Sequence, residues 1–216
     1  MPLLEKAGAK LFGNYEMLSG GLMGPAVQML TGAPYFDTDH GAVSSEDLWT
    51  YINDHLARNW MITCASHFGS GSDQDQNKIG VPFRHAFTVM DTAELSDGTK
   101  LIQIRNPWGK ETYHGPWSDK SDKWTEALAA DVGGVKKAND GVWWISADDY
   151  RESFWWTTAN PDVQDEVMSH YAVYELDTPS LVSHKLNLAS SDDQTVYISV
   201  YTYNAQHYSN GNCDDF

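Results

Sequence analysis

The chain has 216 residues, of which 41% are hydrophobic and 12% aromatic, enough apolar material for the core of one globular domain or one and a half. It carries 14 Lys and Arg residues against 30 Asp and Glu residues, which gives a net charge of -16 and a sequence pI near 4.6. Such an acidic chain repels polyanions, so nucleic acid and anionic membrane surfaces are poor partners for it. It has no apolar run of ~18 residues, so we expect no membrane span.

The two cysteines, Cys64 and Cys213, lack the spacing of a disulfide framework, which is typical of a protein kept in a reducing compartment. The first residues, MPLLEKAGAKLFG, place charges where a signal peptide needs an unbroken apolar run. We therefore predict an unsecreted protein in the cytoplasm.

The first predicted element is a short amphipathic helix over residues 2–11, where apolar residues recur at helical spacing. A helix that starts at the first residue is typical of a chain cut within a domain, so we expect further sequence upstream. Farther on, Ser44 and Asp47 form a capping pair ahead of a helix that reaches Leu56. A short buried strand over residues 60–64 and an exposed polar loop over residues 70–80 are expected next.

Two strand-like runs, HAFTVMD and KLIQIRN, flank a turn-rich connector, TAELSDGT. This pattern predicts an antiparallel hairpin. If Asp91 of the first run stands opposite Lys100 of the second, the same register places His85 opposite Asn106.

Three more elements are expected in this module. Ser121 is predicted to open a helix that runs through Leu128, and the run GVWWIS is predicted to form a strand. Ser146 and Asp149 then form a capping pair for a helix that reaches Phe154.

Beyond the first module, which is expected to end near Trp156, the pattern consists of strand-like runs alone, HYAVYEL, LVSHKLNL and TVYISVYTY. They predict the start of a β-sandwich. Three or four strands leave the face and edges of such a sheet uncovered unless more chain follows, so we expect the carboxyl end to be cut as well.

The predicted pairing of His85 with Asn106 has a chemical meaning. A thiolate nucleophile needs an imidazole that takes its proton and later protonates the leaving amine, and the imidazole needs an orienting partner. A neutral amide orients the ring without adding negative charge beside the thiolate, as in the Cys-His-Asn variant of the catalytic triad. Trp108, two residues after Asn106, is placed to shield the pair from water. The alternative is a chance pairing with a structural Trp in a turn.

Five segments of the chain closely resemble the protease core of the calpain family: EKAGAKLFGNYEMLSGG, HAFTVMD, LIQIRNPWG, GPWSDKSDKW and NDGVWWISADDYRESF. The resemblance covers residues 2–156 in the same order. It implies an α+β fold, with a papain-like second lobe over residues 1–158, an antiparallel sheet with flanking helices, followed by an incomplete β-sandwich segment over residues 159–216. By the same resemblance the chain is a calpain-like intracellular cysteine endopeptidase that acts on proteins. His85 is then the general acid and base, Asn106 orients it and Trp108 packs over the pair.

The nucleophile that the resemblance requires is missing. In calpains it lies at a helix start in the first lobe, ahead of the segment that resembles EKAGAKLFGNYE, and no QGxLGDCWF-like stretch occurs here. We therefore expect a first lobe with the cysteine as an upstream partner and an inactive chain without it. Cys64 precedes His85 as the family order demands, but it lies in an apolar strand and not at a helix amino terminus that would lower its pKa. A self-sufficient protease that uses Cys64 is the less favoured alternative, and Cys213 is interpreted as incidental.

Calcium is the cofactor that the resemblance implies for this lobe. Asp119 and Asp140 match two ligand positions of the family, whereas Thr112 and Val142 stand where two further acidic ligands are expected. Glu111 is a neighbouring carboxylate that would compensate only in part. Because calcium takes six to eight oxygens, several of them charged, we predict weak binding at most. A solvated acidic surface is the alternative reading.

Arg84 departs from the family as well, because calpains usually have Gly at this place close to bound substrate. Its side chain either obstructs the cleft or faces solvent at a strand start. Together with Thr112 and Val142 it supports a second hypothesis, in which the chain is a non-catalytic calpain-like binding or regulatory module.

Overall fold

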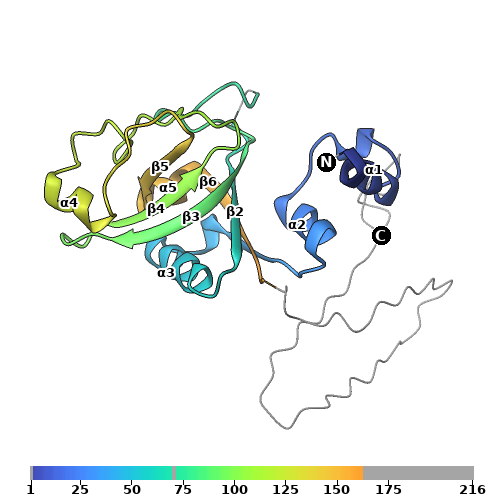
Figure 1. Cartoon of the computed structure of the whole chain (residues 1–216), viewed down its shortest axis with the longest axis horizontal. Coiled ribbons are helices and arrows are strands. Elements are labelled where there is room, and N and C mark those ends of the chain that lie inside the picture. Colours follow the sequence, from blue (N-terminus) through green and yellow to red (C-terminus); the bar gives the residue numbers. More distant parts are fainter. Residues whose placement is uncertain (1, 70–71, 163–216) are drawn as a thin grey trace, which may run out of the picture.

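Six strands pair into one antiparallel sheet, in the order β1-β6-β2-β3-β4-β5 (Figure 1). The computed structural model describes residues 2–69 and 72–162. The strands are β1 (Phe36–Asp39), β2 (Met61–Ser66), β3 (Ala86–Glu94), β4 (Lys100–Arg105), β5 (Val142–Ser146) and β6 (Phe154–Asn160). The α+β class with an antiparallel sheet and flanking helices, predicted from the sequence, is confirmed.

The α-helices of the described residues are α1 (Pro2–Leu11), α2 (Met23–Thr31), α3 (Ser45–Leu56), α4 (Glu126–Asp131) and α5 (Ala147–Ser153). Short 3-10 helices lie at Glu16–Leu18 and His40–Ala42. Figure 1 shows α1 beyond α2 and away from the sheet. The bounds of α1 confirm the predicted amphipathic helix, and none of these helices has the length and hydropathy of a membrane span.

The predicted capping pair of α3 is present, since the Asp47 amide donates to Ser44 Oγ at 3.1 Å. The helix then turns Leu48 and Ile52 inward, where they are 1% and 0% exposed. Burying a side chain of this kind contributes about 2 kcal/mol to folding. The apolar spacing of α3 therefore fixes the helix against the sheet.

Apolar clusters lie on both faces of the sheet at β4, because successive residues of a strand point to opposite sides. Ile102 belongs to the main core, which includes residues of α3 and α5. Leu101 belongs to a second cluster with Trp117 and Trp144, against which Leu128 of α4 packs. Neither Ile102 nor Leu101 is exposed to solvent.

The predicted helix through Leu128 is present, but its predicted start at Ser121 is wrong, because α4 begins at Glu126. Thr125 caps α4 by accepting a hydrogen bond from the Leu128 amide, whereas Ser121 Oγ accepts one from the Lys123 amide at 3.2 Å. Serine and threonine are both favoured caps, so residue type alone does not choose between the two positions.

The sequence pattern does not reveal α2, β1 or β6. Strand β6 follows α5 without a connecting turn, and it lies between β1 and β2 in the interior of the sheet. The sheet therefore continues past Trp156 to Asn160. The β-sandwich strands expected within residues 163–216 lie outside the described residues.

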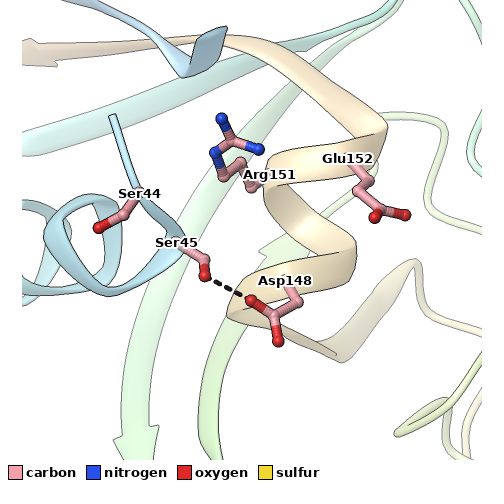
Figure 2. A pocket seen from close by; sticks show the side chains of 5 residues that line it. All are labelled: Ser44, Ser45, Asp148, Arg151 and Glu152. Carbon is pink, nitrogen blue, oxygen red and sulfur yellow. Dashed lines mark hydrogen bonds between the residues drawn. The ribbon is translucent and has the colours of Figure 1, made fainter. Parts of the chain in front are cut away.

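A shallow depression of about 470 Å³ lies between the amino-terminal end of α3 and α5, and it contains none of the candidate site residues (Figure 2). Within it, Ser45 Oγ donates to an Asp148 carboxylate oxygen. Arg151 Nε donates to the Val43 carbonyl at 2.6 Å. The first bond joins α3 to α5, and the second joins α5 to the segment just before α3, so we assign the depression a structural role.

A buried histidine lies beneath this junction. His40 is 2% exposed, and its Nε2 stands 2.7 Å from Thr157 Oγ1, which is also 2.7 Å from the Tyr150 hydroxyl. Burial lowers the pKa of His40 to about 4, and its Nδ1 has no hydrogen-bond partner among the described residues. The folded protein therefore holds a neutral imidazole at pH 7.

Replacing His40 with Gln is expected to make the free energy of unfolding less sensitive to acid. The unfolded chain protonates His40 near its ordinary pKa of 6.5, whereas the folded protein does so only near pH 4. Stability therefore falls as the pH drops through this window, by about 3 kcal/mol at its lower end. Urea denaturation of wild type and His40→Gln between pH 7 and pH 4 measures the difference. His114→Gln, which removes an exposed imidazole, is the control, and equal pH dependence in all three proteins would contradict the assignment.

Candidate active site

His85 lies immediately before β3 and is held by the end of β2. The Ser66 amide donates to the His85 carbonyl at 3.0 Å, and the His85 amide donates to Ser66 Oγ at the same distance. Ser66 is 1% exposed, whereas His85 is partly exposed. The backbone of His85 is therefore fixed, while its imidazole remains accessible.

Asn106 follows β4 and is fully buried. Its amide donates to the Gly141 carbonyl at 2.7 Å, and its own carbonyl accepts from the Gly109 amide at 3.0 Å. Its side-chain Oδ1 accepts from the Trp108 amide at 3.0 Å. The backbone carbonyl and the side chain of Asn106 thus both accept hydrogen bonds from the turn that Asn106 begins.

The two side chains meet, with His85 Nε2 at 2.9 Å from Asn106 Oδ1. The Trp108 amide can only donate, so the Asn106 atom that it contacts must be the carbonyl oxygen. This orientation makes His85 Nε2 the donor of the second bond and leaves Nδ1 as the basic nitrogen of the neutral ring. The arrangement suits an imidazole that takes a proton through Nδ1.

Aromatic rings enclose the imidazole on two sides. The Trp108 ring centroid lies 4.2 Å from that of His85, with 33° between the planes. Phe87 meets it edge-on at 4.7 Å. The structure therefore brings His85, Asn106 and Trp108 together, in an apolar setting that strengthens the histidine–asparagine bond.

The predicted hairpin is present, but its predicted register is wrong. Asp91 pairs with Gln103 and Lys100 with Glu94, and an irregularity at Met90 shifts the ladder between Asp91 and Val89. On the His85 side of this irregularity, Val89 pairs with Ile104, so the pairing differs from the predicted one by two residues. A shift of two preserves the face of the sheet, so His85 and Asn106 become diagonal neighbours, still within reach of each other.

Arg84 occupies a left-handed backbone conformation, with φ of 51°. Its amide donates to the His67 carbonyl and its Nε to the Phe68 carbonyl, both at 2.9 Å. A left-handed residue with a side chain costs about 1–2 kcal/mol, whereas glycine adopts the conformation freely. This backbone requirement explains why a glycine is expected here, and the side chain of Arg84 is exposed beside His85.

Cys64 lies on β2 in the main core and is fully buried. Burial raises the pKa of its thiol to about 12, against a smaller opposing effect of a hydrogen bond with Tyr150. A thiol with such a pKa keeps its proton at neutral pH, so Cys64 does not supply a thiolate nucleophile.

The candidate calcium ligands are bonded to protein donors. Asp119, 4% exposed, accepts from the Ala138 amide at 3.2 Å, and burial raises its carboxyl pKa. The Lys136 ammonium, 2.7 Å from Asp140, lowers the pKa of Asp140. Burial raises the pKa of Glu111, with the nearby Asp119 adding to the shift.

No group of three His, Cys, Asp or Glu side chains within residues 2–69 and 72–162 is arranged to hold a metal ion. Thr112 and Val142 add no carboxylate, and Val142 is the first residue of β5. Of the four family positions, only Asp119 and Asp140 therefore supply a carboxylate, so weak calcium binding stays a prediction.

Sequence reasoning missed Ser66 and Gly141, which position the pair through their backbones. Gly141 has φ of 83°, and a Cβ there would lie 2.9 Å from the Asn106 carbonyl oxygen. The Asp140-Gly141 pair, a common turn signal, is the only trace of this role in the sequence.

Gly141→Ala is expected to destabilise the protein by at least about 1 kcal/mol more than Gly98→Ala. Both glycines have similar positive φ values, but a Cβ at Gly98 would meet nothing within 4 Å. The strain of the left-handed backbone is therefore common to both variants, and only Gly141→Ala displaces Asn106. Urea denaturation measures the loss, and nuclear magnetic resonance of the His85 ring reports the displacement. Equal losses with unchanged ring signals would contradict this role.

Cys64 is expected to resist alkylation in the folded protein. With its pKa near 12 and not at the ordinary 9.0, the reactive thiolate is ~1,000-fold rarer at neutral pH. Iodoacetamide labelling of Cys213→Ser, followed by mass spectrometry, should modify Cys64 in urea but not in native buffer. Equal rates in the two conditions would show an accessible thiol.

Comparisons with known proteins identify the family to which the chain belongs. The family model described as calpain family cysteine protease matches residues 1–159. Over 159 residues the chain is 36% identical to the calpain-type cysteine protease ADL1 of Oryza sativa subsp. japonica and 37% identical to the calpain-type cysteine protease DEK1 of Zea mays, matches that cover 70% of this chain and 7% of each relative. It is 32% identical to calpain-9 of Rattus norvegicus over 160 residues, which cover 70% of this chain and 23% of that protein. The chain thus spans less than a quarter of these relatives, and it belongs to the calpain family of cysteine proteases.

Proposed function

We propose that the chain provides the histidine and asparagine of a calpain-like intracellular cysteine endopeptidase, and that the nucleophilic cysteine comes from a first lobe outside this chain. The observation that carries the proposal is the bond between His85 Nε2 and Asn106 Oδ1, with Nδ1 left as the base. The chain has two cysteines without disulfide-like spacing, which supports a reducing, cytosolic location. Proteins cut in exposed, extended segments are the proposed substrates.

The geometry gives each residue a step in peptide hydrolysis. His85 Nδ1 takes the thiol proton, and the thiolate attacks the peptide carbonyl carbon. His85 then gives that proton to the leaving amine, which breaks the C–N bond and leaves a thioester. Water attacks the thioester carbon while His85 takes the water proton, and the proton returns to sulfur as the carboxylic acid leaves.

Asn106 and Trp108 support these steps without reacting. The amide oxygen of Asn106 holds the ring in one tautomer and accepts from the imidazolium while it carries the extra proton. Trp108 covers the ring at 4.2 Å and limits the access of water to this bond. The buried Cys64 leaves the nucleophile to be supplied by another part of the enzyme.

The exposed Arg84 supports a second candidate function, a non-catalytic calpain-like module that binds proteins. Its side chain stands next to His85 and is anchored to the Phe68 carbonyl. A cation at this place would hinder the approach of a peptide along His85 and favour binding to acidic segments without cleavage.

The test joins the first lobe of the maize relative to this chain and measures hydrolysis of an unfolded protein. The chain alone is expected to be inactive and to resist a thiol-directed protease inhibitor at Cys64, whereas the hybrid is expected to cleave. His85→Ala should lower kcat/KM of the hybrid by at least about 10⁴-fold, because the thiol then lacks its base.

His114→Ala is the matched control, since it removes an exposed histidine of the same lobe and should leave turnover unchanged. A folded hybrid that does not cleave, beside an active two-lobed core of the maize relative, would reject the endopeptidase and favour the binding module. Activity of the chain alone that Cys64→Ala abolishes would reject the need for a second lobe.

A further inference from the structure

The acidic residues near the turn that follows β4 are bonded to donors of the protein. Asp140 Oδ1 accepts from the Val142 amide at 3.1 Å, and its Oδ2 lies 2.7 Å from the Lys136 ammonium. Asp119 Oδ2 accepts from the Ala138 amide at 3.2 Å. These bonds join the segment 136–142 to the loop that contains Asp119.

A second set of bonds joins the same loops from the other side. Glu111 Oε1 accepts from the Asp119 amide at 3.3 Å, and the Glu111 amide donates to Asn139 Oδ1 at 2.7 Å. The Gly141 carbonyl then accepts from the Asn106 amide at 2.7 Å. The closed loops therefore contact the asparagine that holds His85.

We propose that hydrogen bonds and one ion pair hold these loops together without calcium. The Lys136 ammonium is the counterion of Asp140, and the Ala138 and Val142 amides donate to the carboxylates that would otherwise bind a metal ion. The proposal does not depend on proteolytic activity. It predicts that the alignment of Asn106 in this lobe is insensitive to calcium.

The chemistry of the loops supports this assignment. A calcium ion needs six to eight oxygen ligands, and it repels an ammonium that shares one of its carboxylates. Calcium could displace Lys136, whose side chain is 79% exposed. The Ala138 and Val142 amides already occupy one acceptor position each on Asp119 and Asp140, and the uncharged Thr112 and Val142 offer no further carboxylate.

The first arm of the test compares thermal unfolding of the full chain in millimolar CaCl₂ and MgCl₂ at equal ionic strength. Magnesium is needed because any divalent cation screens a chain of net charge -16. We expect the two Tm values to agree within about 1 °C. A saturable, calcium-specific rise in Tm that Asp140→Asn removes would overturn the proposal. A calcium-specific rise that persists in Asp140→Asn but is removed by Asp119→Asn would overturn it as well, whereas a rise that persists in both variants would support it, because the ion then binds away from these loops.

The second arm tests the counterion. Lys136→Gln should lower Tm by about 1–2 °C relative to Lys137→Gln, and Lys136→Arg should restore it. Lys137 is also exposed, and within the described residues it makes no ion pair. Each Gln variant removes one positive charge, so the two differ only in the loss of the Lys136–Asp140 ion pair. Equal Tm values for these two variants would overturn the role of Lys136.

Discussion

The site depends on the hydrogen bonds of one buried residue, Asn106. Its backbone amide is fixed by the Gly141 carbonyl, and its side-chain oxygen accepts from both the Trp108 amide and His85. The Trp108 amide can only donate, so its bond to Oδ1 sets the orientation of the side chain and then the tautomer of the histidine, while the buried Nδ2 of Asn106 has no hydrogen-bond partner among the described residues. The β3–β4 hairpin, the turn after β4 and the start of β5 are therefore coupled at a single residue.

The histidine that Asn106 holds and the nearby carboxylates have different surroundings. The imidazole lies among apolar rings, where a hydrogen bond to a neutral amide is strengthened and no second negative charge is introduced. The carboxylates of Asp119 and Asp140 lie in the loops that follow β4, where they accept hydrogen bonds from backbone amides. The left-handed backbone of Arg84 directly precedes His85 in the chain.

Local signals in the sequence predicted much of the fold because they act through neighbouring residues. The Ser44 cap and the apolar spacing of α3 specify a helix wherever it packs, and the same holds for α1 and for the cap of α5 by Ser146. The helix expected at Ser121 failed because Thr125, four residues later, offers an equivalent cap. Strand β6 has no turn before it, so only its partners β1 and β2 identify it as an interior strand.

The sequence by itself determined the chemistry of the candidate pair, since residue types and strand parity place His85 and Asn106 on one face of a hairpin. It also identified the calpain resemblance. Only the tertiary structure decided the register, because the irregularity at Met90 shifts the pairing of β3 with β4 and no local signal in the sequence marks it. It also decided the burial of Cys64, the left-handed backbone of Arg84 and the approach of Gly141 to Asn106. These depend on contacts between segments far apart in the chain, which local patterns do not contain.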